Sequence, residues 1–103
     1  MPMKQTETLA WILYDIAADR ARTKVAKLCK EAGLHRVQKS CFLGTIQRNR
    51  LDELVMGITD LIDAGADRVY IFPLCDPDFR KVQTLGQAFD PDLVTDEVKS
   101  LFL

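Results

Sequence analysis

Asp15 is the first candidate for chemistry in this sequence, because it is a carboxylate near the end of an apolar run at residues 10–16. Burying an unpaired charge costs several kcal/mol or more, so Asp15 must be paired, bound to a metal ion or left at the wet edge of a sheet. One carboxylate is too little for tight Mg²⁺ binding, which uses one or two carboxylates with waters and phosphate oxygens. A two-fold axis joining two copies of Asp15 would supply the second carboxylate. The alternatives are a cap at a helix entry or an ion pair with Arg22.

A basic segment follows Asp15 directly. Residues 20–39 hold seven of the fourteen lysines and arginines with Glu31 as their one acid, whereas residues 51–103 are acidic and the whole chain has a net charge of −1. This asymmetry predicts an anionic partner at one surface; the alternative is a solvated helix face that the acidic half balances. On the helix expected here the basic residues occupy separate flanks, one with Arg20, Lys24 and Lys27, and others with Arg22 and Lys30.

The cysteines and the single histidine form no metal-ligand pattern. Cys29, Cys41 and Cys75 are widely spaced, and His35 cannot complete a zinc set with any pair of them. We therefore expect reduced, buried thiols. Phe42 is expected in the core, with a surface on which a base stacks as the alternative.

Hydrophobic spacing predicts four strands and two helices. The first strand is almost continuously apolar, which is typical of a central strand covered on both faces. In the first helix apolar residues recur on one face, Asp19 is the expected N-cap and Gly33 supplies a left-handed stop. We expect Pro73 to close the last strand. The expected strands cover residues 8–14, 34–38, 41–46 and 69–72, and the expected helices cover residues 20–32 and 47–63.

This element order, β-α-β-β-α-β, predicts an α+β fold of the ferredoxin-like type, with two helices on one face of an antiparallel sheet. The other face would carry apolar side chains without cover from the chain, so we expect a homodimer. Gly57 lies inside the second helix, where glycine costs about 1 kcal/mol relative to alanine. We expect it to allow close packing on the sheet.

The 103 residues are expected to form a single domain. Within it we expect a frayed N-terminus at residues 1–7, a core at residues 8–85 and a C-terminal arm at residues 86–103. Beyond the six main elements we expect an irregular acidic loop at residues 75–79, a fifth short strand at residues 81–85 and a helix or extended arm at residues 91–103. No apolar run approaches the roughly 20 residues that span a bilayer, and no signal peptide is evident, so we expect a cytoplasmic protein without membrane contact.

Several of these residues together carry a family resemblance. They are Tyr14-Asp15-Ile16, Arg22, Lys24, Gly33-Leu34 and the run Arg36-Val37-Gln38-Lys39-Ser40-Cys41-Phe42. Over about residues 8–85 the chain resembles the small universal CRISPR-associated proteins of the Cas-two family. The resemblance implies a ferredoxin-like homodimer that partners the integrase of the same adaptation module during spacer acquisition. It also implies that the last short strand, near residues 81–85, pairs with the sheet of the partner subunit.

The resemblance further implies a site at the dimer axis. Asp15 of both chains would bind Mg²⁺ there, and Tyr14 would flank it as the second catalytic residue. Lys24 stands where some relatives have arginine. The lysine keeps the positive charge but lacks the planar guanidinium that can bind two phosphate oxygens at once. Leu43 stands where many relatives have glutamate, which removes a polar group from the end of that strand. With the basic segment included, the implied nucleic-acid contacts are Arg20, Arg22, Lys24, Arg36 and Phe42.

Two functions follow as hypotheses. The first is a metal-dependent endonuclease that cleaves phosphodiester bonds of RNA or DNA. The second is a structural adaptor without nuclease activity, which bridges integrase subunits on spacer DNA through its basic face and through the apolar, acidic tail at residues 91–103. A third class, a dimer that binds a small metabolite, has little support because the five glycines are isolated and form no phosphate-binding loop.

Overall fold

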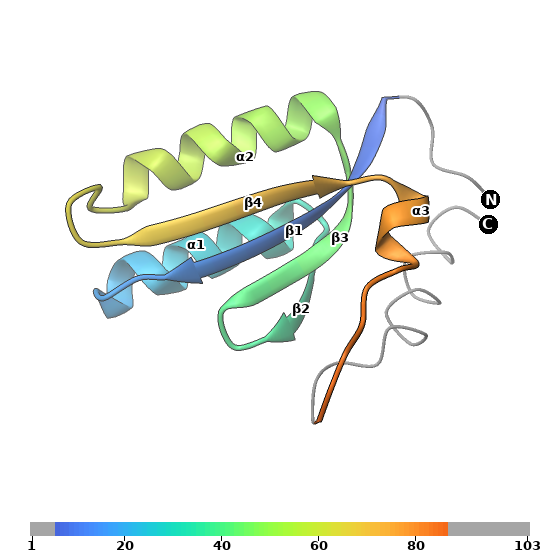
Figure 1. Ribbon diagram of the computed structural model, residues 1–103. Helices are drawn as coiled ribbons and strands as arrows, with labels where there is room; N and C mark the ends of the chain where they lie inside the picture. Colours follow the sequence, from blue (N-terminus) through green and yellow to red (C-terminus); the bar gives the residue numbers. More distant parts are fainter. Residues whose placement is uncertain (1–5, 87–103) are drawn as a thin grey trace.

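Four strands form one antiparallel sheet in the order β2-β3-β1-β4 (Figure 1). The structure is a computed structural model, and it describes residues 6–86. The strands are β1 (Glu7–Asp15), β2 (His35–Gln38), β3 (Cys41–Gln47) and β4 (Arg68–Leu74), and the helices are α1 (Asp19–Glu31), α2 (Arg48–Leu61) and α3 (Asp76–Phe79). Without the short α3, this order is the predicted β-α-β-β-α-β, and the ferredoxin-like α+β class is confirmed.

The main core lies between the sheet and the two long helices, which run along the sheet in Figure 1. Alternate residues of β1 point to this helix side because successive side chains of a strand project to opposite faces. None of the helices within residues 6–86 is long and apolar enough to cross a membrane. The most deeply buried side chains of this core include Ala10, Ile12, Val25, Cys29, Phe42 and Ile58.

Helix α1 begins one residue earlier than the capping pattern predicts. Its N-cap is Ala18, which makes no side-chain capping bond, so the prediction of Asp19 as the cap is wrong. Asp19 is instead the first helical residue, where its carboxylate faces the positive end of the helix dipole and pairs with Arg22. The predicted stop is confirmed, since Gly33 has a φ of +89° and provides the left-handed turn after the helix.

Gly57 of α2 allows close packing, but against a different partner from the one predicted. A Cβ at this position would lie 3.1 Å from the Cδ1 atom of Leu28 in α1. The glycine therefore lets the two helices approach each other, rather than letting α2 approach the sheet.

Strand β4 continues through Pro73, so the prediction that this proline closes the strand is wrong. The reason is its position at the edge of the sheet. Because β4 pairs only with β1 within the described residues, a residue without a backbone N–H is tolerated in it.

The second face of the sheet is partly covered by the chain itself, contrary to the prediction. The expected irregular loop after β4 contains α3, which carries Phe79 onto this face, where it is buried against Leu9 and Leu43. Residues 81–85 form no strand in the single chain. The arm predicted at residues 91–103 lies outside the described residues.

The rest of this second face is only partly covered by residues 6–86, since Trp11 packs against the cluster around Phe79, and we call it the open patch. It is built from two neighbouring cross-strand pairs, Trp11 with Phe72 and Leu13 with Tyr70. Tyr70 and Phe72 are 54% and 48% exposed, which is unusual for side chains of this size in a sheet. The open patch ends at the pair formed by the last residue of β1 and the first residue of β4.

Candidate functional site

Asp15 lies at the end of β1, on the rim of the open patch. Side chains alternate along a strand, and Asp15 lies two residues after Leu13 and four after Trp11. Its side chain therefore projects from the same open face, where it is exposed. Its cross-strand partner is Arg68, the first residue of β4. Neither alternative predicted for Asp15 is found, because Ala18 occupies the helix cap and Arg22 pairs with another residue.

Tyr14 projects from the opposite face and is buried on the helix side. Its hydroxyl donates a long hydrogen bond of 3.5 Å to the Lys39 carbonyl oxygen, and its ring stacks on Phe42 with 6.3 Å between centroids. Burial raises the pKa of the Tyr14 phenol, although the nearby Arg36 charge opposes this shift. The structure therefore separates the phenol from the Asp15 carboxylate of the same chain.

Arg36 and Phe42 form a second arrangement on the helix side of the sheet. The Arg36 guanidinium donates to the Lys39 carbonyl oxygen from Nε at 3.2 Å and from Nη2 at 2.8 Å, and it lies 5.5 Å from the centre of the Phe42 ring. Phe42 is completely buried, which confirms its place in the core. Because Phe42 is buried and the Arg36 guanidinium lies over its ring, the single chain exposes no face of Phe42 on which a base could stack.

Arg22 fastens α1 to the turn that follows the Asp15 strand. Its Nη1 donates to the Ile16 carbonyl oxygen at 3.0 Å, while Nη2 pairs with the Asp19 carboxylate. Two of its donors are thus engaged within the chain. The side chain is nevertheless about one-third exposed, so its remaining edge stays accessible to an anion.

A hollow of about 280 Å³ lies between α1 and β2, and it gathers four cationic side chains. We call it the basic hollow. Its walls come from one flank of α1, where residues four apart are neighbours, and from β2. No carboxylate lines it, so it is suited to an anion such as a backbone phosphate. The exposed Arg20 and Lys24, which were predicted as contacts, do not line it. Its lining residues are Arg22, Thr23, Ala26, Lys27, Lys30 and Arg36.

One chain on its own does not provide a complete metal site. Within residues 6–86 there is no group of three or more His, Cys, Asp or Glu side chains placed to hold a metal ion. Asp15 is exposed and contributes one hard oxygen donor group. This donor set fits Mg²⁺ only if a second carboxylate, waters and phosphate oxygens complete it, as they do in many phosphate-handling sites.

Asp67 is a structural residue of the site that the sequence did not indicate. Its Oδ1 accepts a hydrogen bond from the Ala17 backbone N–H at 3.1 Å, and its Oδ2 accepts one from the Asp63 backbone N–H at 2.9 Å. These two bonds hold the pKa of the Asp67 carboxyl below its usual value. The carboxylate thereby joins the turn after Asp15 to the turn before β4. No local pattern shows this, because Ala17 is fifty residues away in sequence.

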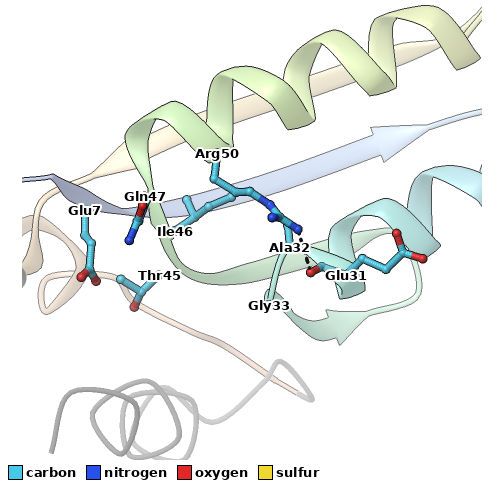
Figure 2. A pocket seen from close by; sticks show the side chains of 8 residues that line it. All are labelled: Glu7, Glu31, Ala32, Gly33, Thr45, Ile46, Gln47 and Arg50. Atoms are coloured by element: carbon cyan, nitrogen blue, oxygen red, sulfur yellow. Dashed lines mark hydrogen bonds between the residues drawn. The ribbon is translucent and has the colours of Figure 1, made fainter.

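A hollow of about 480 Å³ lies near the opposite end of β1 (Figure 2). Arg50 reaches from α2 across this hollow and donates to the Glu31 carbonyl oxygen at 3.1 Å. Glu7, Thr45 and Gln47 line the strand side. None of the predicted site residues belongs to this hollow.

The cysteines differ in their surroundings. Cys29 and Cys41 are buried free thiols, as predicted, whereas Cys75 is exposed, so the prediction is wrong for that residue. Burial raises the pKa of the Cys29 thiol to about 12. Burial also raises the pKa of the Cys41 thiol, with partial opposition from the Trp11 indole N–H, which donates to the sulfur at 2.7 Å.

The sequence of this chain matches a known protein family. Residues 8–82 match the family described as CRISPR associated protein Cas2. The chain belongs to this family. The resemblance seen in the sequence is therefore confirmed, and the match spans the sheet, all three helices and the residues immediately after α3.

Individual relatives agree with this assignment. The CRISPR-associated endoribonuclease Cas2 of Desulforudis audaxviator is 41% identical over 69 residues, which cover 67% of this chain and 65% of that protein. The CRISPR-associated endoribonuclease Cas2 of Korarchaeum cryptofilum is 37% identical over 78 residues, which cover 74% and 82% of the two chains. A solved structure of Streptococcus pyogenes Cas2 at pH 6.5 superposes with a TM-score of 0.65 at 28% identity, covering 76% of this chain and 99% of that one.

Proposed function

We propose that this Cas2 chain forms a homodimer that hydrolyses phosphodiester bonds of RNA, with Mg²⁺ held between the two copies of Asp15. The observation that carries the proposal is the position of Asp15, exposed at the rim of the open patch. The names of the relatives support the reaction class, since those from Desulforudis and Korarchaeum are named endoribonucleases and one from Thermus thermophilus is named an endonuclease.

The open patch supports the proposed dimer. Trp11, Leu13, Tyr70 and Phe72 adjoin one another on one face, and burying such surface contributes about 25 cal/mol for each Å² removed from water. In a two-fold interface the same patch occurs on both sides, so a residue close to the axis meets its own copy. Asp15 adjoins the patch and would meet Asp15 of the second copy in this way. Residues 81–85, which form no strand in the single chain, would pair with the free edge of β4 in the partner.

The chemistry of the proposed site is hydrolysis. A bound Mg²⁺ ion lowers the pKa of a water ligand and stabilises negative charge on the phosphate. One Asp15 carboxylate from each of the two chains would hold the ion on the open face. In the reaction the water oxygen forms a bond to phosphorus while the bond from phosphorus to the leaving sugar oxygen breaks. One water proton passes to solvent, and the leaving oxygen takes up a proton.

The decisive test is Asp15→Asn, with Asp52→Asn as a matched control on the exposed side of α2. Purified proteins are assayed with Mg²⁺ on RNA and on DNA across a range of pH. Asp15→Asn should lower the rate by at least about 100-fold, since loss of metal-bound charge stabilisation removes several kcal/mol. The circular dichroism spectrum should not change. Equal cleavage by the two variants would show that the activity does not arise at Asp15.

A second candidate function, a structural adaptor for the integrase complex, is favoured by the basic hollow. This hollow lies at the α1–β2 side of the molecule, whereas Asp15 ends β1 on the open face beside β4. Backbone phosphates bound at the hollow would therefore lie on the helix side of the sheet, whereas the Asp15 side chain projects from the open face. An adaptor of this kind would keep its full affinity for spacer DNA in the Asp15→Asn variant.

The basic hollow is tested by Lys30→Gln and Arg36→Gln, with Arg50→Gln as a control of equal charge change. Each hollow variant should reduce the dependence of log affinity for duplex DNA on log salt concentration by about 0.9 for each phosphate that the variant no longer binds. The control should retain the wild-type slope.

The protein contact is tested separately by deleting residues 91–103, which should abolish integrase binding while the dimer persists. Unchanged integrase binding would exclude this segment as the contact.

A further inference from the structure

Arg68 lies directly across the β1–β4 ladder from Asp15, at the last residue pair of that ladder. Opposed residues of an antiparallel pair project to the same face, with their Cβ atoms about 4.5–5.5 Å apart. Both side chains are exposed. The fold therefore places an arginine side chain opposite the aspartate, on the same face and next to the open patch.

Within the described part of the chain, neither of these two charged side chains has a bonding partner. Over residues 6–86 no hydrogen bond or ion pair joins the side chain of Asp15 or Arg68 to another group. Two of the three arginines predicted from the sequence form hydrogen bonds elsewhere. Arg22 binds the Ile16 carbonyl and the Asp19 carboxylate, and Arg36 binds a carbonyl oxygen on the helix side of the sheet.

The backbone that carries the pair is restrained by Asp67. Asp67, which precedes Arg68, accepts hydrogen bonds from the backbone of Ala17 and of Asp63. These bonds connect the turn that follows Asp15 with the turn that precedes β4. Both members of the pair thus extend from a regular ladder whose two adjoining turns are joined, which suits a site that must be preorganised for reaction.

We propose that Arg68 binds the phosphate group on which the Asp15 site acts, as a further catalytic residue of the nuclease. This inference rests on the proposed function. Two Asp15 carboxylates balance the charge of one Mg²⁺ ion, so those groups alone offer no net positive charge to a phosphate that gains negative charge in the transition state. Two copies of Arg68 supply that charge. The planar guanidinium fork can also bind two phosphate oxygens at once.

The test compares Arg68→Gln and Arg68→Lys with Arg50→Gln. Arg50 contacts Glu31 near the far end of β1, a strand whose nine residues span about 26 Å. In single-turnover assays with Mg²⁺, Arg68→Gln should cleave RNA about 100-fold more slowly than wild type, as when one charge-stabilising donor is removed. Arg68→Lys should lie between them, because lysine keeps the charge without the fork. Arg50→Gln should match wild type.

A second readout does not depend on cleavage. Binding of the same single-stranded RNA is measured in EDTA at several salt concentrations, and Arg68→Gln should reduce the slope of log affinity against log salt by about 0.7 for each phosphate that the variant no longer binds. A rate and a slope equal to those of Arg50→Gln would overturn the role of Arg68. Equal cleavage by wild type and Asp15→Asn would mean that the proposed function fails. In that case, a salt slope unchanged in Arg68→Gln would also overturn the proposal that Arg68 binds phosphate.

Discussion

Tyr14 and Asp15 are adjacent in the chain, yet their side chains leave opposite faces of the sheet. The Tyr14 ring is buried against Phe42 on the helix side, whereas the Asp15 carboxylate is exposed at the rim of the open patch. Alternation along a β-strand imposes this separation on any two neighbours. A shared position in a sequence motif is therefore no evidence of a shared site.

The first prediction concerns Tyr14→Phe. This change removes one long hydrogen bond, to the Lys39 carbonyl oxygen, and keeps the ring that stacks on Phe42. We expect a loss of less than about 1 kcal/mol in the free energy of unfolding, measured by urea denaturation. Mg²⁺-dependent cleavage should remain within about two-fold of wild type, because the phenol does not face Asp15. A loss as large as that of Asp15→Asn would show that Tyr14 acts in the reaction.

The second prediction concerns how the contribution of Asp67 to stability depends on pH. The pKa of this carboxyl is lowered in the folded protein by the N–H groups of Asp63 and Ala17. The stabilisation is therefore complete above the unfolded value of about 3.9 and is lost as the pH falls through the lower folded pKa. Asp67→Asn should lower the melting temperature at pH 7, and the difference from wild type should shrink between pH 4 and pH 2.

The control is Asp60→Asn, because Asp60 is an exposed carboxylate of α2 whose side chain forms no hydrogen bond or ion pair within residues 6–86. Thermal unfolding of all three proteins, followed by circular dichroism at each pH, gives the comparison. A difference between Asp67→Asn and wild type that stays constant down to pH 2 would contradict a contribution from the ionised carboxylate.

Much of the fold could be predicted because its signals are local. The helical spacing of α1 and the left-handed Gly33 mark the helix and its end, and alternation marks the strands. The cap assigned to Asp19 was a local error, whereas the errors in β4 and after it arose where a distant contact decides the local structure. Pro73 stays in β4 because that strand is at an edge, and α3 follows β4, where Phe79 packs on two strands from the start and middle of the chain.

The site could be predicted only in part, for the same reason. The position of Asp15 follows from the strand alone. Arg68 is fifty-three residues later, and only the register of β1 with β4 reveals that it lies opposite. The basic hollow likewise depends on where β2 places Arg36 against α1. Helical spacing alone grouped Arg20, Lys24 and Lys27 on one flank, and it gave no sign that Arg22 and Lys30 would join Arg36 in one hollow.

The third prediction concerns the reactivity of the three thiols. A pKa of about 12 for Cys29 leaves roughly one thiolate in 10⁴ at pH 8, and burial also blocks access. Cys41 is buried with a raised pKa, whereas Cys75 is exposed. Iodoacetamide at pH 8 should therefore label one site in the native protein, which peptide mass spectrometry should locate at Cys75. Labelling of all three should require denaturant, and rapid native labelling of Cys29 would contradict the structure.

The last prediction tests the dimer through Phe72→Glu. This side chain is 48% exposed and lies beside Trp11 on the open patch, so a carboxylate there is tolerated in a monomer but would be buried without a partner in the dimer. Sedimentation equilibrium should show a shift from dimer to monomer at micromolar concentration. Met56→Glu is the matched control, because Met56 is 69% exposed on α2 and lies away from the patch. Since one Asp15 alone is not a metal site, the monomeric variant should also lose Mg²⁺-dependent cleavage. A Phe72→Glu protein that remains dimeric would show that the two copies associate through another surface.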